Sequence, residues 1–328
     1  MRVFVTHNPE DLDAYYGRAL PELEEIAEVV RNPSPRDLST PELIEASAGC
    51  EVIVAHRSTP GGAELFAGHP EVLAFLRCAV DISTIDVEAA SAHGVLVARA
   101  DKSFVASTAE LALGLLLDAA RNIASSTVDY RRGGEPPQRP GRQLAGRTAG
   151  IIGYGAIGSH LANLLTALGM RVLVHDPFVD VPPELRVASL HELLARSDAV
   201  FPLAQATPET ENLIGAAELD AMRSDALLVN VSRGELLDEQ AVELALDEGR
   251  IGGLALDVGR AADQRPSPAL AERSDVVATP HLGGLTPENA DAQAASSVEQ
   301  VTAMLAGEVP PRTVNPESAD RFRAWLAR

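Results

Sequence analysis

The residues with the clearest chemical purpose are three glycines, Gly153, Gly155 and Gly158. They are spaced as G-x-G-x-x-G between an apolar run that begins at Thr148 and a stretch with helical spacing. The first glycine permits a tight turn, the second leaves room for a pyrophosphate against the backbone, and the third lets the helix pack close to the strand. The N-terminus of that helix would face the phosphates with free N–H groups and a positive dipole end.

An acidic residue completes this pattern. Asp176 ends a second apolar run and lies eighteen residues after Gly158. A carboxylate at this place can accept hydrogen bonds from a ribose 2′-OH and would repel a 2′-phosphate. The combination predicts a dinucleotide site that prefers NAD to NADP. The alternative is a glycine turn that serves packing only.

Two further side chains could carry a reaction. Arg233 follows the apolar run Val229-Asn-Val, and its guanidinium could grip a carboxylate or polarise a carbonyl. The alternative for Arg233 is a salt bridge to a loop acid. His281 follows another apolar run, with Gly283 and Gly284 leaving room beside it, and suits a general acid/base near neutral pH. A histidine with a purely structural role is the alternative there.

These residues need a sheet to position them. From Thr148 onward, six strand-like runs alternate with helical stretches, as a doubly wound parallel sheet requires. The expected strands cover residues 148–152, 172–175, 199–203, 226–231, 253–257 and 276–279. Residues 1–100 show a second α/β pattern without a glycine fingerprint, in which residues 12–30 have helical spacing. A Ser107…Glu110 capping box indicates the start of a long helix.

The order of these patterns predicts one domain inserted into another. Residues 102–286 would form the dinucleotide-binding domain, and residues 1–101 with 287–328 would form the second. Helices over 107–121 and 287–306 would connect them. The tail around Phe322 to Leu326 is expected to pack back on the first domain. The apolar helix over 111–120 could also pack across a homodimer interface.

Composition narrows the class of partner. The 328 residues carry a net charge of −20, which disfavours nucleic acids and anionic membranes as partners. The only two cysteines, Cys50 and Cys78, share no motif, so we expect a reducing cytoplasm, no disulfide framework and no cysteine-based metal site. No uninterrupted apolar stretch reaches about 18 residues, so no transmembrane helix is expected.

Beyond these local patterns, the chain resembles the D-isomer-specific 2-hydroxyacid dehydrogenases over nearly its whole length. Weaker matches lie upstream, at Arg57-Ser58, Ile85-Asp86 and Ala109-Glu110. The stronger matching stretches are Gly150-Ile-Ile-Gly-Tyr-Gly-Ala-Ile-Gly158, His175-Asp-Pro177, Thr207-Pro-Glu-Thr210, Val229-Asn-Val-Ser-Arg-Gly234, Ala255-Leu-Asp-Val258 and Thr279-Pro-His-Leu-Gly-Gly284.

The resemblance implies an α/β fold in which a doubly wound NAD-binding domain is inserted into a smaller, flavodoxin-like substrate domain. It also implies roles for matching residues. Arg233 would bind the substrate carboxylate and carbonyl, His281 would be the acid/base, and hydride would pass between substrate C2 and the nicotinamide. The residues implied to bind cofactor, in addition to the three glycines and Asp176, are Ala156, Ile157, Thr207, Val231, Ser232, Asp257 and Gly283.

The first departure from the family concerns the partner of the histidine. Family members usually carry a glutamate that hydrogen-bonds the histidine, and counting from Asp257 places Ala262 at its position. The adjacent Asp263 could substitute if the loop shifts by one residue. Without a carboxylate partner, the imidazolium of His281 loses a stabilising charge.

The second departure concerns the substrate loop. Val80-Asp81 stands where the family usually has a glycine-rich loop whose N–H groups cradle the carboxylate. Together with Arg57, these two residues are the expected substrate contacts. Asp81 would repel an anionic substrate unless its side chain points away or pairs with Arg57.

The leading hypothesis is therefore an NAD-dependent oxidoreductase that acts on a small D-2-hydroxy or 2-oxo acid. The alternative is a dinucleotide-binding sensor or scaffold with weak or lost dehydrogenase activity, favoured by the two departures. A phosphoglycerate dehydrogenase with a regulatory domain is disfavoured, since the sequence ends soon after the second connecting helix. Formate dehydrogenase has no specific support.

Overall fold

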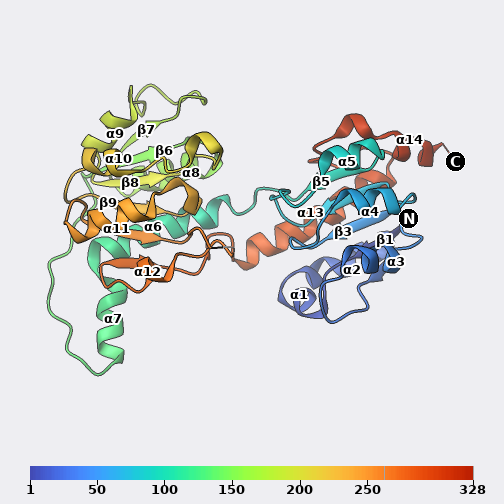
Figure 1. The fold of residues 1–328 in the computed structure, drawn as a ribbon, viewed down its shortest axis with the longest axis horizontal. Coiled ribbons are helices and arrows are strands. Elements are labelled where there is room, and N and C mark those ends of the chain that lie inside the picture. The colour runs from blue at the N-terminus through green and yellow to red at the C-terminus, as the bar shows by residue number, and fades with distance from the viewer. Residues whose placement is uncertain (262, 328) are drawn as a thin grey trace. The chain divides into compact units, whose positions relative to one another are not determined.

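A computed structural model gives the fold of residues 1–261 and 263–327. The chain divides into two compact units (Figure 1). Unit 1 combines the N-terminal residues Met1–Ser103 with the C-terminal segment that begins at Pro287, and unit 2 comprises Phe104–Thr286. The second unit is thus an insertion in the sequence of the first.

Unit 1 is built on a five-stranded parallel sheet with the order β2-β1-β3-β4-β5. This is the strand order of flavodoxin-like folds. Strands β3 and β4 of this sheet are fully buried, as expected for a parallel sheet covered on both faces. The strands are β1 (Arg2–Val5), β2 (Glu28–Arg31), β3 (Val52–Ala55), β4 (Ala74–Arg77) and β5 (Leu96–Arg99).

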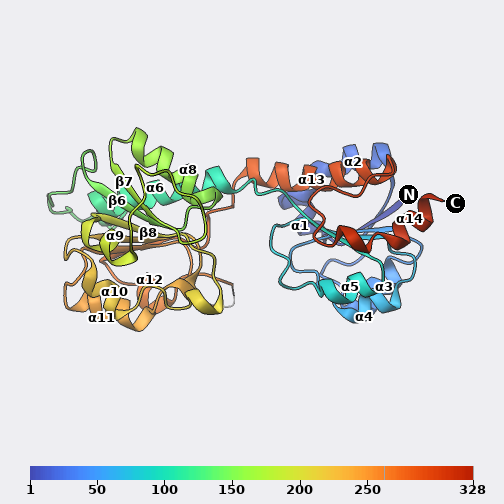
Figure 2. The ribbon, with the colours of Figure 1, turned by 90° about the horizontal axis from the view of Figure 1, so that it is seen from above.

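Helices cover both faces of this sheet, with α2 and α13 on one side and α3, α4 and α5 on the other (Figure 2). The C-terminal helix α14 packs on the same unit, since Phe322 is buried in a core with Val3 and Val5. The expected docking of the tail is therefore confirmed. The helices are α1 (Pro9–Ala14), η1 (Tyr16–Ala19), α2 (Leu20–Ile26), α3 (Thr40–Ala46), α4 (Ala63–Gly68), α5 (Val87–Ala92), α13 (Pro287–Leu305), η4 (Pro316–Ser318) and α14 (Asp320–Leu326).

Unit 2 contains a six-stranded parallel sheet with the order β11-β10-β9-β8-β6-β7. A single parallel bridge from Val174 to Arg186 extends it beyond β7. The chain leaves β6 to one side for β7 and crosses to the other side for β8, so the switch point lies between β6 and β8. The strands are β6 (Thr148–Ile152), β7 (Arg171–His175), β8 (Ala199–Pro202), β9 (Leu227–Asn230), β10 (Gly253–Leu256) and β11 (Val276–Ala278).

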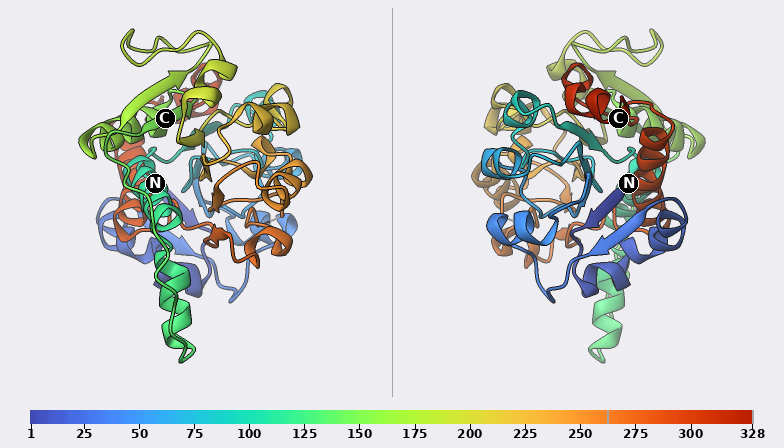
Figure 3. Two further views of the ribbon diagram at one scale, coloured as in Figure 1. Left: turned by 90° about the vertical axis from the view of Figure 1, so that its left-hand side faces the viewer. Right: turned by 90° about the vertical axis from the view of Figure 1, so that its right-hand side faces the viewer.

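Two helices, α6 and α8, cover one face of this sheet, and α9, α10, α11 and α12 lie toward the other (Figure 2). The buried residues of α6, among them Leu115 and Leu116, join the same core as β6 and α8. Helix α7 projects away from the rest of its unit (Figure 3). The helices are α6 (Val105–Arg121), α7 (Ile123–Arg131), α8 (Ala156–Ala167), α9 (Leu190–Arg196), η2 (Pro208–Thr210), α10 (Ala216–Ala221), η3 (Gly234–Leu236), α11 (Glu239–Asp247) and α12 (Pro268–Ala271).

Two local expectations were wrong. Residues 12–30 do not form one helix, because Glu28–Arg31 is an edge strand whose residues are exposed or half-buried. Helix α6 begins at Val105, and the Ser107 hydroxyl donates to the carbonyl of Phe104 inside the first turn. The expected capping box is therefore absent there. No helix among the described residues has the length and apolar character needed to cross a membrane.

Candidate active site

The carboxyl ends of the strands in unit 2 gather the residues that the sequence singled out. The glycine turn follows β6, Asp176 follows β7, and Thr207 lies in the segment after β8. Arg233 follows β9, and Asp257 follows β10 directly. His281 follows the last strand, β11. Because neighbouring parallel strands end at one edge, these side chains share the edge where open α/β sheets bind ligands.

The three glycines of the turn have three different steric environments. Gly153 has φ of +99°, and a Cβ there would lie 2.7 Å from the backbone of Leu203 and Ala204. A Cβ on Gly158 would lie 2.2 Å from the carbonyl oxygen of Gly153, so α8 packs directly on the turn. A Cβ on Gly155 would meet nothing within 4 Å. Gly155 therefore borders open space at the N-terminus of α8, where the first N–H groups, those of Ala156 and Ile157, lack intrahelical partners.

The carboxylate of Asp176 holds the glycine turn in place. Its Oδ2 accepts from the N–H of Tyr154 at 2.7 Å, and its Oδ1 accepts from Phe178 and Val179 at 2.8 and 3.0 Å. Partial burial would raise the pKa of Asp176, but these three N–H donors outweigh it and lower the pKa below its usual value. The group is therefore a carboxylate at neutral pH, fixed beside the turn.

Polar residues after β8 and β9 are tied together. The hydroxyl of Thr210 accepts from the N–H of Thr207 at 2.8 Å and donates to the carbonyl of Gln205 at 2.6 Å. Ser232 donates its hydroxyl to the carbonyl of Ala204 at 3.3 Å. The adjacent Val231 is buried. These contacts fix the two segments that the resemblance assigns to the cofactor.

Arg233 is positioned by the last residue of β9. The buried amide of Asn230 donates to the carbonyl of Arg233 at 2.8 Å, and its oxygen accepts from the N–H of Ser232 at 3.0 Å. The next residue, Gly234, packs so tightly against Gly259 that a Cβ would lie 2.2 Å from its carbonyl carbon. Arg233 is half-buried, and its guanidinium donates to the carbonyl of Ser232 at 2.8 Å. Among the described residues it forms no salt bridge.

His281 lies on a tight turn that a buried carboxylate organises. Asp257 is completely buried; its Oδ1 accepts from the Thr279 hydroxyl at 2.6 Å and from the N–H of Leu282 at 2.7 Å. Its Oδ2 accepts from the N–H of Gly283 at 2.8 Å. His281 itself has φ of +63°, an uncommon conformation for a residue with a side chain. Asp257 thus holds both flanks of His281 in position.

The position of the family's glutamate, Ala262, lies outside the described residues. Its neighbour Asp263 is exposed and pairs with Arg265, accepting from the Arg265 N–H at 3.1 Å and lying 3.3 Å from its guanidinium. Within the part of the chain that the structure describes, no carboxylate contacts the imidazole of His281. The suggested catalytic role of Asp263 stays a prediction.

The expected substrate residues belong to unit 1. Arg57 is exposed just after β3, whereas Val80 and Asp81 follow β4. Neither Val80 nor Asp81 has a positive φ, so side chains stand at these two positions without backbone strain. The Oδ1 atom of Asp81 accepts from the N–H of Ser83, two residues further along the same loop, at 2.9 Å.

Sequence reasoning missed the buried arginine that ties these loops together. Arg77 donates to the carbonyls of His56 and Thr59 and to the hydroxyl of Thr84. Its side chain is almost inaccessible, and burial lowers its pKa to about 10, which leaves it charged at neutral pH. The sequence signal that could have revealed Arg77 is an arginine at the end of an otherwise apolar strand. Asn230 and Thr279 were also overlooked, although both lie within the quoted motifs.

Comparisons with known proteins agree with this geometry. Residues 113–283 match the model of the D-isomer specific 2-hydroxyacid dehydrogenase, NAD binding domain. A glyoxylate reductase from Korarchaeum cryptofilum is 33% identical, and the alignment covers 96% of both chains. The crystal structure of TT0316 protein from Thermus thermophilus superposes with a TM-score of 0.83 at 31% identity, covering 96% of this chain and all of the other.

A third relative is longer than this chain. The D-3-phosphoglycerate dehydrogenase of Methanocaldococcus jannaschii is 33% identical over 92% of this chain but only 58% of its own length. The chain therefore spans little more than half of that relative. The family model and the glyoxylate reductase, matched over 96% of its length, are sufficient to assign the family. The chain belongs to the D-isomer-specific 2-hydroxyacid dehydrogenases, whose NAD-binding domain corresponds to unit 2.

Proposed function

We propose that the protein transfers hydride between NAD(H) and the C2 atom of a small D-2-hydroxy or 2-oxo acid. The observation that carries this proposal is the turn at His281, which Asp257 holds at the same sheet edge as Arg233 and the glycine turn. That edge combines a phosphate-binding helix N-terminus, a fixed guanidinium and an acid/base.

Bound NAD(H) supplies or accepts the hydride. Arg233, which forms no salt bridge among the described residues, binds the substrate carboxylate and polarises the C2 carbonyl. In the reducing direction, the imidazolium of His281 donates a proton to the carbonyl oxygen. In the oxidising direction, neutral His281 accepts the hydroxyl proton. Asp257 keeps the imidazole in place throughout, because it holds the backbone on both sides.

The cofactor preference follows from Asp176. Its carboxylate is fixed beside the glycine turn and repels a 2′-phosphate, so NAD is preferred to NADP. Measured affinities for NADH and NADPH test this preference, and tighter binding of NADPH would exclude it.

The substrate is a small 2-oxo acid, as the name of the glyoxylate reductase relative suggests. Arg57 and the backbone of Val80 and Asp81 are our candidates for further substrate contacts. The Oδ1 atom of Asp81 accepts from the N–H of Ser83 in the same loop, and the backbone of this loop is the part that we assign to the substrate carboxylate. Replacing Arg57 with Ala should raise the KM for the 2-oxo acid and leave NADH affinity unchanged.

The protein works as a cytoplasmic homodimer in this proposal. Both cysteines are buried free thiols, as suits a reducing compartment. Helix α7 contributes no buried residue to its unit, while Ile123 and Tyr130 are more than half exposed, which supports a contact with a second copy. Sedimentation of a monomer at micromolar concentration would exclude the dimer.

A panel of 2-oxo acids assayed with NADH tests the activity. His281→Ala should lower kcat by about 10²- to 10⁴-fold, the usual contribution of a general acid. His191→Ala is the matched control, because His191 is an exposed histidine of the same unit. If no 2-oxo acid is reduced while NADH still binds, the chain is the dinucleotide-binding sensor or scaffold instead.

A further inference from the structure

A buried arginine contacts both loops of unit 1 that carry the expected substrate residues. Arg77 is the last residue of β4, and the other three residues of that strand are apolar. The first loop, here called the Arg57 turn, covers residues 56–59 and follows β3. The second, here called the Val80 loop, covers residues 78–84 and follows β4. Because β3 and β4 are neighbours in a parallel sheet, both loops leave the same edge.

The guanidinium of Arg77 donates hydrogen bonds to both loops. Its Nη1 donates to the carbonyl of His56, and its Nη2 donates to the carbonyl of Thr59 at 2.7 Å. The same Nη2 donates to the hydroxyl of Thr84 at 2.9 Å. The two carbonyls belong to the first and last residues of the Arg57 turn, and Thr84 is the last residue of the Val80 loop. One side chain therefore closes both loops at their bases.

Stability alone does not explain a charged residue at this position. Arg77 is 1% exposed, and burial lowers its pKa to about 10, so it stays charged at neutral pH. Its Nε is buried without a hydrogen-bond partner among the described residues. An unpaired buried donor destabilises a fold, and replacing a buried charge with a well-packed apolar side chain is often neutral or stabilising. The contacts with the two loops give this arginine a purpose that an apolar residue could not serve.

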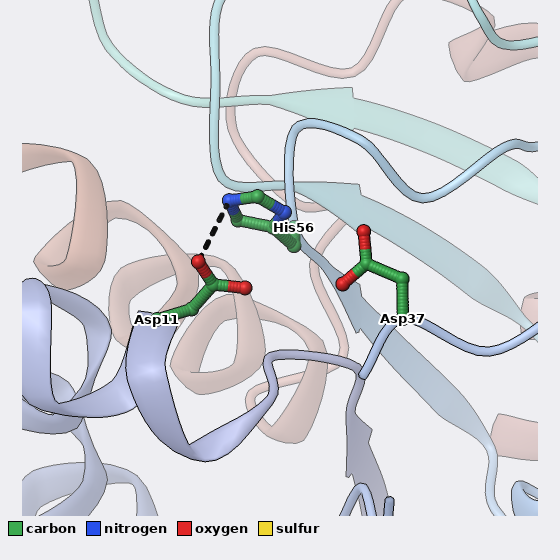
Figure 4. Close-up of side chains that lie close together, drawn as sticks. All are labelled: Asp11, Asp37 and His56. Carbon is green, nitrogen blue, oxygen red and sulfur yellow. Dashed lines mark ion pairs between the residues drawn. The ribbon is translucent and has the colours of Figure 1, made fainter. Parts of the chain in front are cut away.

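The Arg57 turn is also held by the side chain of His56. Its Nε2 lies 3.6 Å from Oδ1 of Asp11, and Figure 4 shows a carboxylate on each side of the imidazole. Ser58 ties the turn to the second of these acids, because its hydroxyl donates to Oδ2 of Asp37 at 2.6 Å. Arg57 itself is exposed, and its guanidinium forms no hydrogen bond or salt bridge among the described residues. The backbone of the turn is thus fixed while this guanidinium is available for a ligand.

The Val80 loop is tied at both ends in a similar way. The N–H of Cys78 donates to the carbonyl of Ala55 at 2.9 Å, and the carbonyl of Thr84 accepts from the N–H of Gly61 at 3.1 Å. Between these ties, the N–H of Val80 has no acceptor among the described residues. A loop that is closed at its base and leaves such a donor unpaired is suited to binding a carboxylate.

We propose that Arg77 is a positioning residue, which fixes the Arg57 turn and the Val80 loop in the arrangement that binds the carboxylate of the 2-oxo acid. This inference rests on the proposed function, because it takes both loops as substrate contacts. Arg77 acts through these loops and not by contact with the substrate. A guanidinium suits this task because its planar fork offers donors in fixed directions, whereas the ammonium of lysine is a compact point charge.

Steady-state kinetics of Arg77→Met test this role. Methionine fills the position but donates no hydrogen bond, so the KM for the 2-oxo acid should rise about tenfold or more, while kcat and the Kd for NADH change little. Arg77→Lys keeps a charge and donors and should recover part of this loss. A variant that is merely less stable would lose active protein, which lowers the apparent kcat and leaves KM unchanged.

Arg99→Met is the matched control. Arg99 ends the neighbouring strand β5, pairs in register with Arg77, and forms no side-chain hydrogen bond or salt bridge within the described part of the chain. This variant should keep the wild-type KM. If Arg77→Met does not fold, two variants of Thr84 take its place. Thr84→Val removes one acceptor and should raise KM about threefold, whereas Thr84→Ser keeps the hydroxyl and should not.

A double-mutant cycle shows whether Arg77 acts through Arg57. Arg57→Ala should raise KM strongly in wild type and in Arg99→Met, but much less in Arg77→Met, where the turn is already released. Fully additive effects would overturn the positioning role, as would a wild-type KM in Arg77→Met or, where that variant does not fold, in Thr84→Val. These outcomes leave the proposed function intact. A wild-type protein that reduces no 2-oxo acid would instead refute the proposed function, and this inference with it.

Discussion

The position of His281 depends on one buried side chain. Asp257→Asn replaces one carboxylate oxygen with an NH₂ group, which cannot accept a hydrogen bond. Either the Thr279 hydroxyl or the N–H of Gly283 therefore loses its acceptor. We expect a loss of about 2–4 kcal/mol in the free energy of unfolding, since a buried donor loses its partner. The kcat should also fall while the Kd for NADH changes little, because the imidazole is displaced.

Denaturant unfolding and steady-state kinetics measure these two effects. Thr279→Ser keeps the hydroxyl that donates to Asp257 and should preserve both stability and kcat. If Asp257→Asn loses stability but keeps the wild-type kcat, Asp257 does not position His281.

Because Ala262 stands where the family has a glutamate, a second prediction concerns the pH dependence of the reaction. Ala262→Glu should place a carboxylate where the family has one and stabilise the imidazolium of His281. Reduction of the 2-oxo acid requires that imidazolium, so its pH–rate profile should extend to higher pH. Asp263→Asn tests the alternative, because a profile that shifts to lower pH in this variant would show that Asp263 already supports the histidine. An unchanged profile for Ala262→Glu would show that another acid already supports the histidine.

At the scale of elements, Gly155 and Gly158 look alike in the sequence of the glycine turn but have different roles, one in cofactor binding and one in packing. Gly155→Ala should weaken NADH binding by at least tenfold but leave Tm unchanged, because the new Cβ enters open space that we assign to the pyrophosphate. Gly158→Ala should instead lower Tm, because its Cβ meets the carbonyl of Gly153 at 2.2 Å. NADH titration and thermal unfolding distinguish them. A stable Gly155→Ala variant with wild-type NADH affinity would contradict the assignment.

The elements of unit 2 could be predicted because four of its strands, β6, β8, β9 and β10, are fully buried. Runs such as those of β8 and β9 are fully buried and almost entirely apolar, and their observed ends lie within one residue of the expected ones. Edge strand β2 was missed, because Glu28–Arg31 continues the acidic, helix-like spacing of the preceding residues and is hardly buried. Pairing with β1, a tertiary contact, decides its conformation.

The same distinction applies to the candidate sites. Arg233 and His281 could be selected because each follows a buried strand within a specific motif. The loop contacts of Arg77 could not, since its partners His56, Thr59 and Thr84 come from separate parts of the chain. Only the strand order brings them together. A local sequence pattern can therefore identify a functional residue that follows a single strand. Residues that come together from several segments can be identified only once the strand order is known.

For the whole molecule, the two units differ in the histidines that they bury. His7 and His69, both in unit 1, are almost inaccessible, and burial lowers the pKa of each below its usual value. His7 stacks on Tyr16 with ring centroids 4.1 Å apart, and its Nε2 lies 3.0 Å from the hydroxyl of Tyr15. Among the described residues of unit 2, no histidine is buried.

This difference predicts that acid destabilises unit 1 first. Below about pH 6.5 the histidines of the unfolded chain bind protons, whereas the buried histidines of the folded chain stay neutral. The free energy of unfolding therefore decreases as the pH falls from about 6.5 toward the lowered pKa values of the folded state. Each histidine contributes up to about 1.4 kcal/mol per pH unit in that window. Hydrogen exchange, corrected for its intrinsic pH dependence, should show amides of unit 1 losing protection between pH 6.5 and 5 before those of unit 2. Combining His7→Gln with His69→Gln should flatten this dependence, whereas His191→Gln in unit 2 should preserve it; earlier opening of unit 2 would contradict the assignment.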